Sequence, residues 1–327
     1  MKKIEQAPLV GAVVLPQQTE RKKVRGALKI AGAVLMVSIL VTGVGYENTK
    51  DIKITPLEIR SEAVPDALDG VTVIHLSDIH MDDKWGNSMS PELLGSLQER
   101  IDALGLSEEK LITVLTGDIV NKKTSLEMVA QYAEALSRFP GQKFFVWGNH
   151  DIMSKYRNNT RFLAIRKIIE DAGFVFAGEE EETIQWSDGE ELSVIGTPSF
   201  QKQRGRFDKD FYKKLTTQVQ EKTALILAHN MDGMMPVLEH LDGDVVFSGH
   251  THGEQVKVFP RFMQNKIVLD WMLRGYKSPH TEGLKQINEN SWAEISRGIG
   301  SNKLWIVPAL RIGTRPEVPI VTFQKEK

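Results

Sequence analysis

The sequence predicts a layered α/β domain, and two observations support this fold class. Short apolar runs that end in polar residues alternate with stretches of helical periodicity from residue 71 to residue 250. Strands that alternate with helices are typical of a layered α/β domain. Two apolar runs without a helix between them, at 303–310 and 318–323, then follow near the end of the chain. They indicate a mixed sheet or a second sheet.

The expected strands and helices follow in a regular order. The strands are mainly aliphatic runs such as VTVIHLSD and LITVLTGD, and they are expected at 71–78, 111–118, 143–151, 191–198, 224–230 and 244–250. The helices carry apolar residues at helical spacing, as in PELLGSLQERIDALG, and they are expected at 91–105, 125–139 and 161–173. Gly173 is a C-terminal stop for the third helix. Residues 47–70 are expected to form a connecting stretch with some strand character.

The composition excludes several classes of protein. The chain has 327 residues, of which 41% are hydrophobic, and this is ample for one large core or two smaller ones. Cysteine is absent, so disulfide frameworks and thiolate metal sites are excluded. Residues 1–46 carry seven Lys or Arg and two acidic residues, which leaves 34 basic against 41 acidic residues in the rest of the chain. Such an acidic body is not expected to bind nucleic acid.

The amino-terminal segment predicts a membrane anchor. Residues 30–46 contain no charged residue, and their number suits the roughly 17–25 residues that cross a bilayer. Four basic residues at positions 21–25 precede this run, so the positive-inside tendency keeps the amino terminus in the cytoplasm. We expect a bacterial single-pass membrane protein with a basic cytoplasmic tail (1–25), an anchor (26–46) and one extracytoplasmic domain (47–327). A cleaved signal peptide, which would release the domain, is the main alternative, and a buried core helix is another.

Five of the apolar runs end in residue types that bind metal ions. The motifs are DIH at 78–80, GD at 117–118, GNHD at 148–151, AHN at 228–230 and GHTHG at 249–253. The carboxyl ends of strands in an α/β sheet gather along one edge, where ligand sites form. Side chains two apart in an extended segment point the same way, so Asp78 and His80 can face one ion, as can His250 and His252. Flanking glycines let the backbone approach closely.

The donor types restrict the ions that such a site would hold. Carboxylate, imidazole and amide donors without thiolate suit divalent ions such as Mn²⁺, Fe²⁺ or Zn²⁺. The candidate donors are Asp78, His80, Asp118, Asn149, His229, His250 and His252. Seven donors exceed the coordination of one tetrahedral zinc, which suggests two ions that share a carboxylate. Paired ions about 3.5–4 Å apart clamp phosphoryl oxygens and generate hydroxide from bound water.

These motifs resemble those of the calcineurin-like metallophosphoesterases. DIH, GDIVN, GNHD, AHN and GHTHG occur in the order found in that family, across residues 71–255. The closing patterns SRGIG (296–300) and ALRIGTRPEVPIVTF (309–323) also resemble its membrane-associated YkuE/YaeI-type branch. The resemblance implies a four-layer α/β/β/α sandwich, which accounts for the late strands without helices between them.

The resemblance also implies a role for each matching residue. Asp78, His80 and His252 would bind the first ion. Asn149, His229 and His250 would bind the second ion, and Asp118 would bridge the two. His150 matches the family's non-ligand histidine, which protonates the leaving oxygen or steadies the transition state. Asp151 matches the carboxylate that orients this histidine.

The function implied by the resemblance is metal-dependent hydrolysis of a phosphate ester by in-line attack of a metal-bound hydroxide. With the predicted anchor, it favours phosphodiester or pyrophosphate bonds in an envelope or lipid-linked substrate. A phosphomonoesterase, including a protein phosphatase, is an alternative, and so is a non-catalytic, metal-stabilised envelope scaffold. His150 argues against the scaffold, because a scaffold needs no acid for a leaving group.

A few features depart from the family pattern or have no clear place in it. Glu254 stands where the branch usually has the second glycine of GHTHGGQ, and we expect it to alter specificity rather than abolish metal binding. His75 is expected in the core or behind the metal ligands rather than among them. Arg204 and Arg206 form a basic loop that either docks phosphate or is simply solvated. The apolar stretch at 262–276 is expected to be a core helix or to rim the site.

Overall fold

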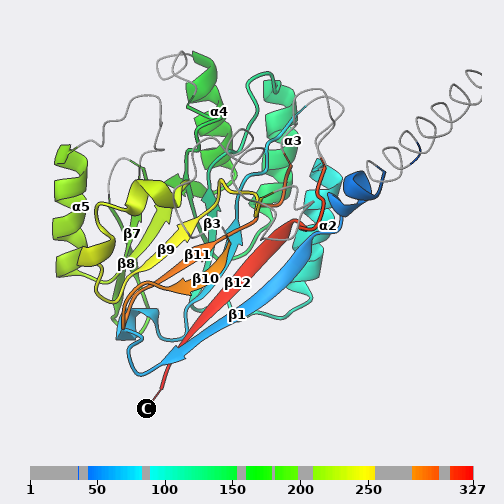
Figure 1. Cartoon of the computed structure of the whole chain (residues 1–327). Coiled ribbons are helices and arrows are strands. Elements are labelled where there is room, and N and C mark those ends of the chain that lie inside the picture. The colour runs from blue at the N-terminus through cyan, green and yellow to red at the C-terminus, as the bar shows by residue number, and fades with distance from the viewer. Residues whose placement is uncertain are drawn as a thin grey trace, which may run out of the picture. The chain divides into compact units, whose positions relative to one another are not determined.

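A computed structural model describes residues 36, 43–82, 89–152, 160–178, 181–197, 209–254, 282–301 and 310–326 (Figure 1). Within these ranges the protein has a mixed α/β fold with two six-stranded sheets. The strand order is β1-β12-β2-β3-β4-β5 in the first sheet and β10-β11-β9-β8-β7-β6 in the second. The predicted α/β class and the second sheet are therefore confirmed.

The first sheet is mainly parallel. Its strands are β1 (Lys53–Ser61), β2 (Thr72–Leu76), β3 (Leu111–Thr116), β4 (Gln142–Val146), β5 (Phe174–Phe176) and β12 (Glu317–Lys325). Strands β2 to β5 pair in parallel, whereas β12 pairs antiparallel with β2 and parallel with β1. The strand β12 therefore lies between two strands that precede it by more than 200 positions (Figure 1).

The second sheet has a parallel centre and antiparallel edges. Its strands are β6 (Glu182–Gln185), β7 (Glu191–Gly196), β8 (Ala224–Ala228), β9 (Val245–Ser248), β10 (Gly283–Gln286) and β11 (Trp292–Ile295). Strands β7, β8, β9 and β11 run parallel, and β6 and β10 close the two edges as antiparallel partners. The parallel strands β8 and β9 are buried along their whole length, as their continuous apolar runs require.

The helices are amphipathic and two of them begin at serine caps. They are α2 (Pro91–Asp102), α3 (Leu126–Ser137), α4 (Thr160–Asp171) and α5 (Lys209–Glu221), with short 3₁₀ helices η1 (Asp66–Leu68), η3 (Met231–Met234) and η4 (Leu238–His240). The side chain of Ser90 accepts a hydrogen bond from the backbone N–H of Leu93, and Ser125 accepts one from Met128. These bonds satisfy backbone donors that the first turn of a helix leaves free.

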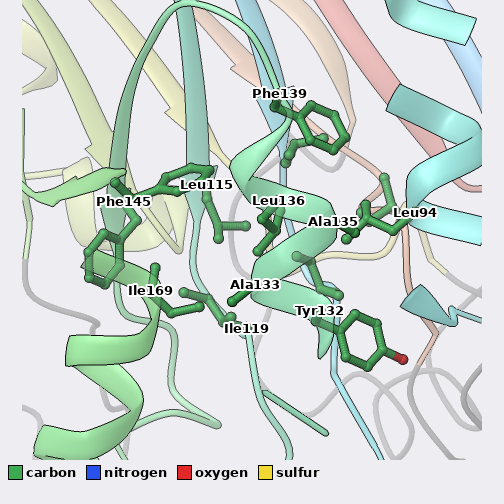
Figure 2. Close-up of a cluster of buried hydrophobic side chains, with 14 of the residues drawn as sticks. Leu94, Leu115, Ile119, Tyr132, Ala133, Ala135, Leu136, Phe139, Phe145 and Ile169 are labelled. Carbon is green, nitrogen blue, oxygen red and sulfur yellow. The ribbon is translucent and has the colours of Figure 1, made fainter. Parts of the chain in front are cut away.

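Three clusters of buried hydrophobic side chains fill the spaces between the sheets and the helices. The first joins α2, α3 and α4 to the first sheet, and Figure 2 shows Leu136 of α3 in the same cluster as Leu115 and Phe145 of that sheet. The second lies between the two sheets, and the third joins α5 to the second sheet. Alternate residues of β3 face different clusters, with Leu115 in the first and Val114 in the second. This follows from the two-residue period of a strand.

The sequence prediction fails where an element has little buried surface. Strand β1 was expected only as a connecting stretch, because it pairs at a sheet edge and most of its residues are partly or fully exposed. Helix α5 was not expected, since its buried side chains Tyr212, Leu215 and Val219 are interrupted by polar residues. The short strands β5, β6 and β10 were also not expected, nor was β11, which is fully buried but has only four residues. The apolar run at 318–323 is confirmed within β12, whereas nearly all of the run at 303–310 lies outside the described residues.

The anchor expected at 26–46 falls almost wholly outside the described residues, which include only Met36 and positions 43–46 of it. In the part of the chain that the structure describes, no helix combines the length and the apolar character that a bilayer crossing requires. The membrane anchor therefore stays a prediction. The basic loop at Arg204 and Arg206 and the stretch at 262–276 lie outside the described residues as well.

The buried carboxyl of Asp244 joins three segments at the amino end of the second sheet. Its side chain accepts hydrogen bonds from the backbone N–H groups of Ala224 and Asp242, at 2.8 and 2.9 Å, and its own N–H donates to Ser291 Oγ. Burial raises the pKa of Asp244 from 3.8 to about 7. The folded protein therefore retains a proton on this carboxyl over a pH range in which the unfolded chain has lost it.

Asp244 should make the free energy of unfolding fall as the pH rises. The stabilisation from its proton is fully present below about pH 4 and is lost as the pH rises through about 7. We expect the stability of the native chain to fall relative to an Asp244→Asn variant, by up to about 1.4 kcal/mol per pH unit. Urea unfolding of both proteins between pH 4 and pH 7.5 measures this difference. A constant difference across that range would contradict the prediction.

Candidate metal centre

All seven candidate donors lie in loops that follow the carboxyl ends of parallel strands. The first sheet supplies four of them, namely Asp78 and His80 after β2, Asp118 after β3, and Asn149 after β4. The second sheet supplies His229 after β8, and His250 and His252 after β9. Because the strands concerned are parallel neighbours within each sheet, their carboxyl ends present these loops at one edge.

The donor atoms of these loops converge in three groups, in each of which the atoms lie within 4.8 Å of one another. The groups are Asp78–His80–His252, His80–Asp118–His150 and Asp118–His229–His250. Asn149 joins the third group, because its Oδ1 lies 3.1 Å from His229 Nε2. The structure therefore brings the whole predicted donor set together, and it places His150 beside it.

Asp118 lies between the donors of the two sheets. Its Oδ1 is 3.3 Å from Nε2 of His229, which comes from the second sheet. Its Oδ2 is 3.7 Å from Nε2 of His80 and 4.0 Å from Nε2 of His150, which come from the first sheet. The two oxygens of one carboxylate thus face different groups of nitrogen atoms, which is the arrangement that a shared ligand requires.

Hydrogen bonds to Nδ1 of His229 and of His80 orient these rings, so that Nε2 of each ring faces a nitrogen of a second histidine. His229 Nδ1 lies 2.8 Å from the carbonyl oxygen of Thr116, and His80 Nδ1 lies 3.2 Å from Asn121 Oδ1. Both partners are acceptors, so each ring donates from Nδ1, and in its neutral form the ring has its lone pair on Nε2. These Nε2 atoms lie 3.1 Å from His250 Nδ1 and from His252 Nε2 respectively. Such convergence of lone pairs suits a cation.

The electrostatics of the site also suit a divalent cation. Burial lowers the pKa of His80 and of His250 to about 3, and it lowers the pKa of His252 well below its ordinary value. These rings are therefore neutral at pH 7, as metal ligands must be. Burial opposes ionisation of Asp118, but His229 and His150 outweigh it and hold the pKa of this carboxyl well below its usual range. The carboxylate stays charged.

The pKa of His229 shows that the electrostatic potential at the centre is negative. Burial disfavours the protonated ring, but the carboxylate of Asp118 outweighs burial and raises the pKa of His229 to about 9. The centre thus attracts positive charge strongly enough to reverse the effect of desolvation. A divalent cation would be favoured by the same potential and would take the place of this proton.

Asp78 has one oxygen fixed by the protein and one oxygen directed to the centre. Its Oδ2 accepts hydrogen bonds from Ser77 Oγ at 2.6 Å and from the backbone N–H of His250 at 2.9 Å. Its Oδ1 is buried and has no hydrogen-bond partner among the described residues, and it lies 3.6 Å from His252 Nε2. A buried carboxylate oxygen without a partner is costly, and coordination of a cation would satisfy it.

Backbone strain is concentrated on the same residues. Six non-glycine residues of the described chain have a positive φ, and five of them are the candidate donors Asp78, His80, Asp118, His250 and His252, with φ between 49° and 70°. The sixth is Glu254, with a φ of 56°. Each such residue costs about 1–3 kcal/mol and persists only where the surrounding structure imposes it. This clustering supports a functional role for the five donors, because strain of this kind collects at active sites.

His150 and Asp151 occupy different positions in the loop after β4. The backbone N–H of His150 donates to Asp118 Oδ1 at 2.8 Å, and its side chain is 29% exposed, so its ring can reach a substrate. The Asp151 carboxylate accepts hydrogen bonds from the backbone N–H groups of Gly148, Val120 and Ile119. Asp151 therefore ties the β3 and β4 loops together. Its expected role in orienting the His150 ring stays a prediction, as does the effect of Glu254 on specificity.

Arg311 is a residue of the centre that the sequence reasoning did not identify. Its guanidinium is fully buried and donates to the carbonyl oxygens of His252 and Arg297 at 2.9 and 2.8 Å. It also donates to the carbonyl oxygens of Gly298 and Gly300 and to Ser301 Oγ. The arginine thus ties the GHTHG loop to the SRGIG segment. The patterns SRGIG and ALRIGTRPEVPIVTF are recognisable in the sequence, but nothing local in them shows that Arg311 is buried.

Replacement of Arg311 by methionine should destabilise the protein by about 3 kcal/mol or more, because several buried carbonyl oxygens would lose their donor. Arg315 offers a matched control four residues further on. Its ion pair with Asp51, at 2.8 Å, joins side chains that are 48% and 53% exposed, so Arg315→Met should cost less than about 1 kcal/mol. Urea unfolding of the two variants measures both effects. Equal losses would show that Arg311 has no special structural role.

Comparison with known proteins agrees with this geometry. Residues 71–254, which are more than half of the chain, match the family described as calcineurin-like phosphoesterase. The chain is 26% identical over 276 residues to the "Uncharacterized metallophosphoesterase YkoQ" of Bacillus subtilis (strain 168), and the match covers 83% of this chain and 90% of that protein. It is 25% identical over 302 residues to the "Uncharacterized protein YpbG" of the same organism, with 92% and 96% covered.

A third relative comes from a vertebrate. The chain is 22% identical over 320 residues to the "Transmembrane protein with metallophosphoesterase domain" of Danio rerio, and the match covers 94% of this chain and 66% of that protein. The expected YkuE/YaeI-type branch stays a prediction. The family match extends from the start of β2 to the end of the GHTHG loop, and it contains every candidate donor. The chain belongs to the calcineurin-like phosphoesterase family and is a metal-dependent phosphoester hydrolase.

Proposed function

We propose that the protein is a phosphodiesterase or pyrophosphatase with a dinuclear metal centre. The observation that carries the proposal is the position of Asp118, whose two oxygens face two separate groups of nitrogen donors. In this assignment Asp78, His80 and His252 would hold the first ion, Asn149, His229 and His250 would hold the second, and both ions would share Asp118. Two divalent ions, Mn²⁺, Fe²⁺ or Zn²⁺, would supply Lewis acidity to the phosphoryl group and to the attacking water.

The chain's own residues position and protonate the reacting groups. The carboxylates and imidazoles of the centre would hold the ions between the loops of both sheets, and phosphoryl oxygens would bind to these ions rather than to the anionic side chains. His150 stands at the exposed side of the centre, with its ring centroid 4.8 Å from that of His80. From this position its Nε2 can donate a proton to the oxygen that leaves phosphorus. General acid assistance of this kind typically contributes about 10²–10⁴-fold to the rate.

The substrate that we propose is an envelope or lipid-linked phosphate ester. Its support is the predicted membrane anchor at 26–46, together with relatives that are named as transmembrane proteins with a metallophosphoesterase domain. In this proposal the amino terminus is cytoplasmic and the catalytic domain faces outward from a bacterial membrane. A domain secreted after cleavage of a signal peptide would act on the same chemical class from solution.

The full-length chain, purified in a mild detergent and loaded with Mn²⁺, provides the direct test. Bis-4-nitrophenyl phosphate reports diester hydrolysis and 4-nitrophenyl phosphate reports monoester hydrolysis. We expect turnover of the diester and about two Mn²⁺ per chain by elemental analysis, as a shared carboxylate between paired ions requires. Turnover of the monoester alone would favour a phosphomonoesterase. Bound metal without turnover of either ester would support a non-catalytic scaffold and contradict the proposal.

A further inference from the structure

A chain of buried polar side chains runs from the space between the two sheets to the metal centre. It begins at Glu294 of β11, whose carboxyl oxygen Oε2 forms a short hydrogen bond with His75 Nδ1 of β2. His75 Nε2 lies 2.8 Å from Thr116 Oγ1, and Thr116 Oγ1 donates to Ser77 Oγ at 2.8 Å. Ser77 Oγ donates to Asp78 Oδ2 at 2.6 Å. The last member is a candidate metal ligand.

The number of available protons fixes the direction of the three bonds between His75 and Asp78. The hydroxyl of Ser77 has one proton, which goes to the carboxylate of Asp78 at 2.6 Å rather than to the carbonyl oxygen of Thr116 at 3.5 Å. Ser77 must therefore accept from Thr116, and Thr116 must accept from N–H at His75 Nε2. From His75 onward every bond therefore donates towards Asp78, and the proton between His75 Nδ1 and Glu294 can be on either group.

The surroundings keep water away from these groups. Glu294, His75, Thr116 and Ser77 are all fully buried, and the ring of Phe247 packs edge-on against the imidazole of His75. In such an environment hydrogen bonds strengthen one another, and each side chain is held in one orientation. Burial raises the pKa of the Glu294 carboxyl.

The far end of the chain depends on a close approach of the GHTHG loop. A Cβ atom on Gly249 would lie 1.9 Å from Ser77 Oγ and 2.3 Å from Asp78 Oδ2, so only glycine leaves room for this hydrogen bond. The next residue, His250, donates its backbone N–H to the same Oδ2. Both donors therefore hold Oδ2, and Oδ1 is left directed at the centre.

A buried pair of a carboxyl and an imidazole contributes little to the stability of the fold. The free-energy cost of desolvating the two groups offsets most of the gain from their interaction. We propose that Glu294, His75, Thr116 and Ser77 form a positioning relay that orients the Asp78 carboxylate and increases the affinity of the centre for a divalent cation. The proposal rests on the proposed metal-dependent function and adds positioning residues to it. It links the second sheet to a ligand of the first sheet through side chains that touch no substrate.

The central test uses two threonines of the same strand. Thr116→Val removes the hydroxyl from the relay without changing the shape of the side chain. Thr113→Val is the matched control, since Thr113 is equally buried in β3 but donates to the carbonyl oxygen of Pro140, away from the centre. We expect the dissociation constant for Mn²⁺, titrated into the full-length protein and followed by electron paramagnetic resonance, to rise about 10-fold or more in Thr116→Val. Thr113→Val should leave it unchanged.

Two further variants separate a relay from a local packing effect. Thr116→Ser retains the hydroxyl and should restore the Mn²⁺ affinity to within about twofold of the native value. Ser77→Ala breaks the last hydrogen bond and should weaken Mn²⁺ binding as much as Thr116→Val does. Because Thr116 acts through Ser77, the double variant should bind Mn²⁺ no more weakly than Ser77→Ala alone. Additive losses would overturn the relay, since independent packing defects add.

The outcomes distinguish the relay from the proposed function. If the native protein binds Mn²⁺ and hydrolyses esters while Thr116→Val and Ser77→Ala bind Mn²⁺ as tightly as the native protein, the relay is refuted and the function stands. If the native protein binds no Mn²⁺, the proposed function fails and the relay fails with it. Circular dichroism and melting with a chelator present check that each variant folds. A Thr116→Val variant that does not fold transfers the test to Ser77→Ala and Thr116→Ser, whose unchanged affinity would refute the relay.

Discussion

Replacement of Asp118 by asparagine is expected to reduce kcat/KM by about 1,000-fold or more, because the loss of several kcal/mol of Lewis-acid stabilisation corresponds to this factor. Asp118 is the donor whose oxygens face both groups of imidazoles, at 3.3 Å from His229 Nε2 and 3.7 Å from His80 Nε2. Asparagine has the same shape but only one oxygen and no charge. It can keep one of the two contacts, and it cannot compensate the charge of the cations.

The control for Asp118→Asn separates loss of the centre from general effects. Asp232→Asn also removes a carboxylate, at a position three residues after His229 that belongs to none of the donor groups, and it should retain nearly full activity. Melting with a chelator present should show that Asp118→Asn folds. Elemental analysis should show metal lost from Asp118→Asn only. An Asp118→Asn enzyme with more than about a tenth of native activity, a loss of under 1.4 kcal/mol, would contradict the bridging role.

Removal of the divalent ions should lower the melting temperature of the protein by about 10 °C. A ligand at about 1,000 times its dissociation constant stabilises the folded state by about 4 kcal/mol, and 1 kcal/mol moves the melting temperature of a domain of this size by about 2–4 °C. The effect should be large here because the donors come from both sheets, with Asp78 and Asp118 on one side and His229 and His252 on the other. Bound ions would therefore join the sheets.

Calorimetry in Mn²⁺ and in a chelator measures this shift, and the Asp118→Asn variant is its control. The variant should melt at nearly the same temperature under both conditions, because it lacks the shared ligand. Addition of Mn²⁺ to the chelated native protein should restore the higher melting temperature. Equal melting temperatures for the native protein with and without Mn²⁺ would mean that the centre does not bind ions tightly enough to join the sheets.

The sequence predicts the donors because each of them follows a recognisable strand. Asp78 and His80 come after VTVIHL, and Asp118 comes after LITVLT, so their place at the carboxyl ends of parallel strands can be inferred locally. The convergence of both sheets on Asp118 could be expected only from the resemblance to a family. The distances from Asp118 to the imidazole nitrogens can be known only from the folded structure.

Other parts of the site depend on pairings between remote positions. Glu294 is 219 residues away from His75, and its strand WAEI shows no sign that one carboxyl faces the core between the sheets. Arg311 contacts the carbonyl oxygen of His252 across 59 residues. A long polar side chain at such a position is indistinguishable from a surface residue until the fold is known. The positive φ values of the donors are likewise invisible in a sequence, because they follow from tertiary contacts rather than from residue type.

The position of β12 has a consequence for how the protein is made. This strand is the last of the described strands in sequence, yet it lies between β1 and β2 (Figure 1). While the ribosome is still synthesising residues 209–301, β1 and β2 both lack the neighbour that β12 supplies, and the first sheet is incomplete. Pairings over such separations form slowly. We therefore expect the part of the first sheet formed by β1, β12 and β2 to assemble only after residues 317–325 have left the ribosome.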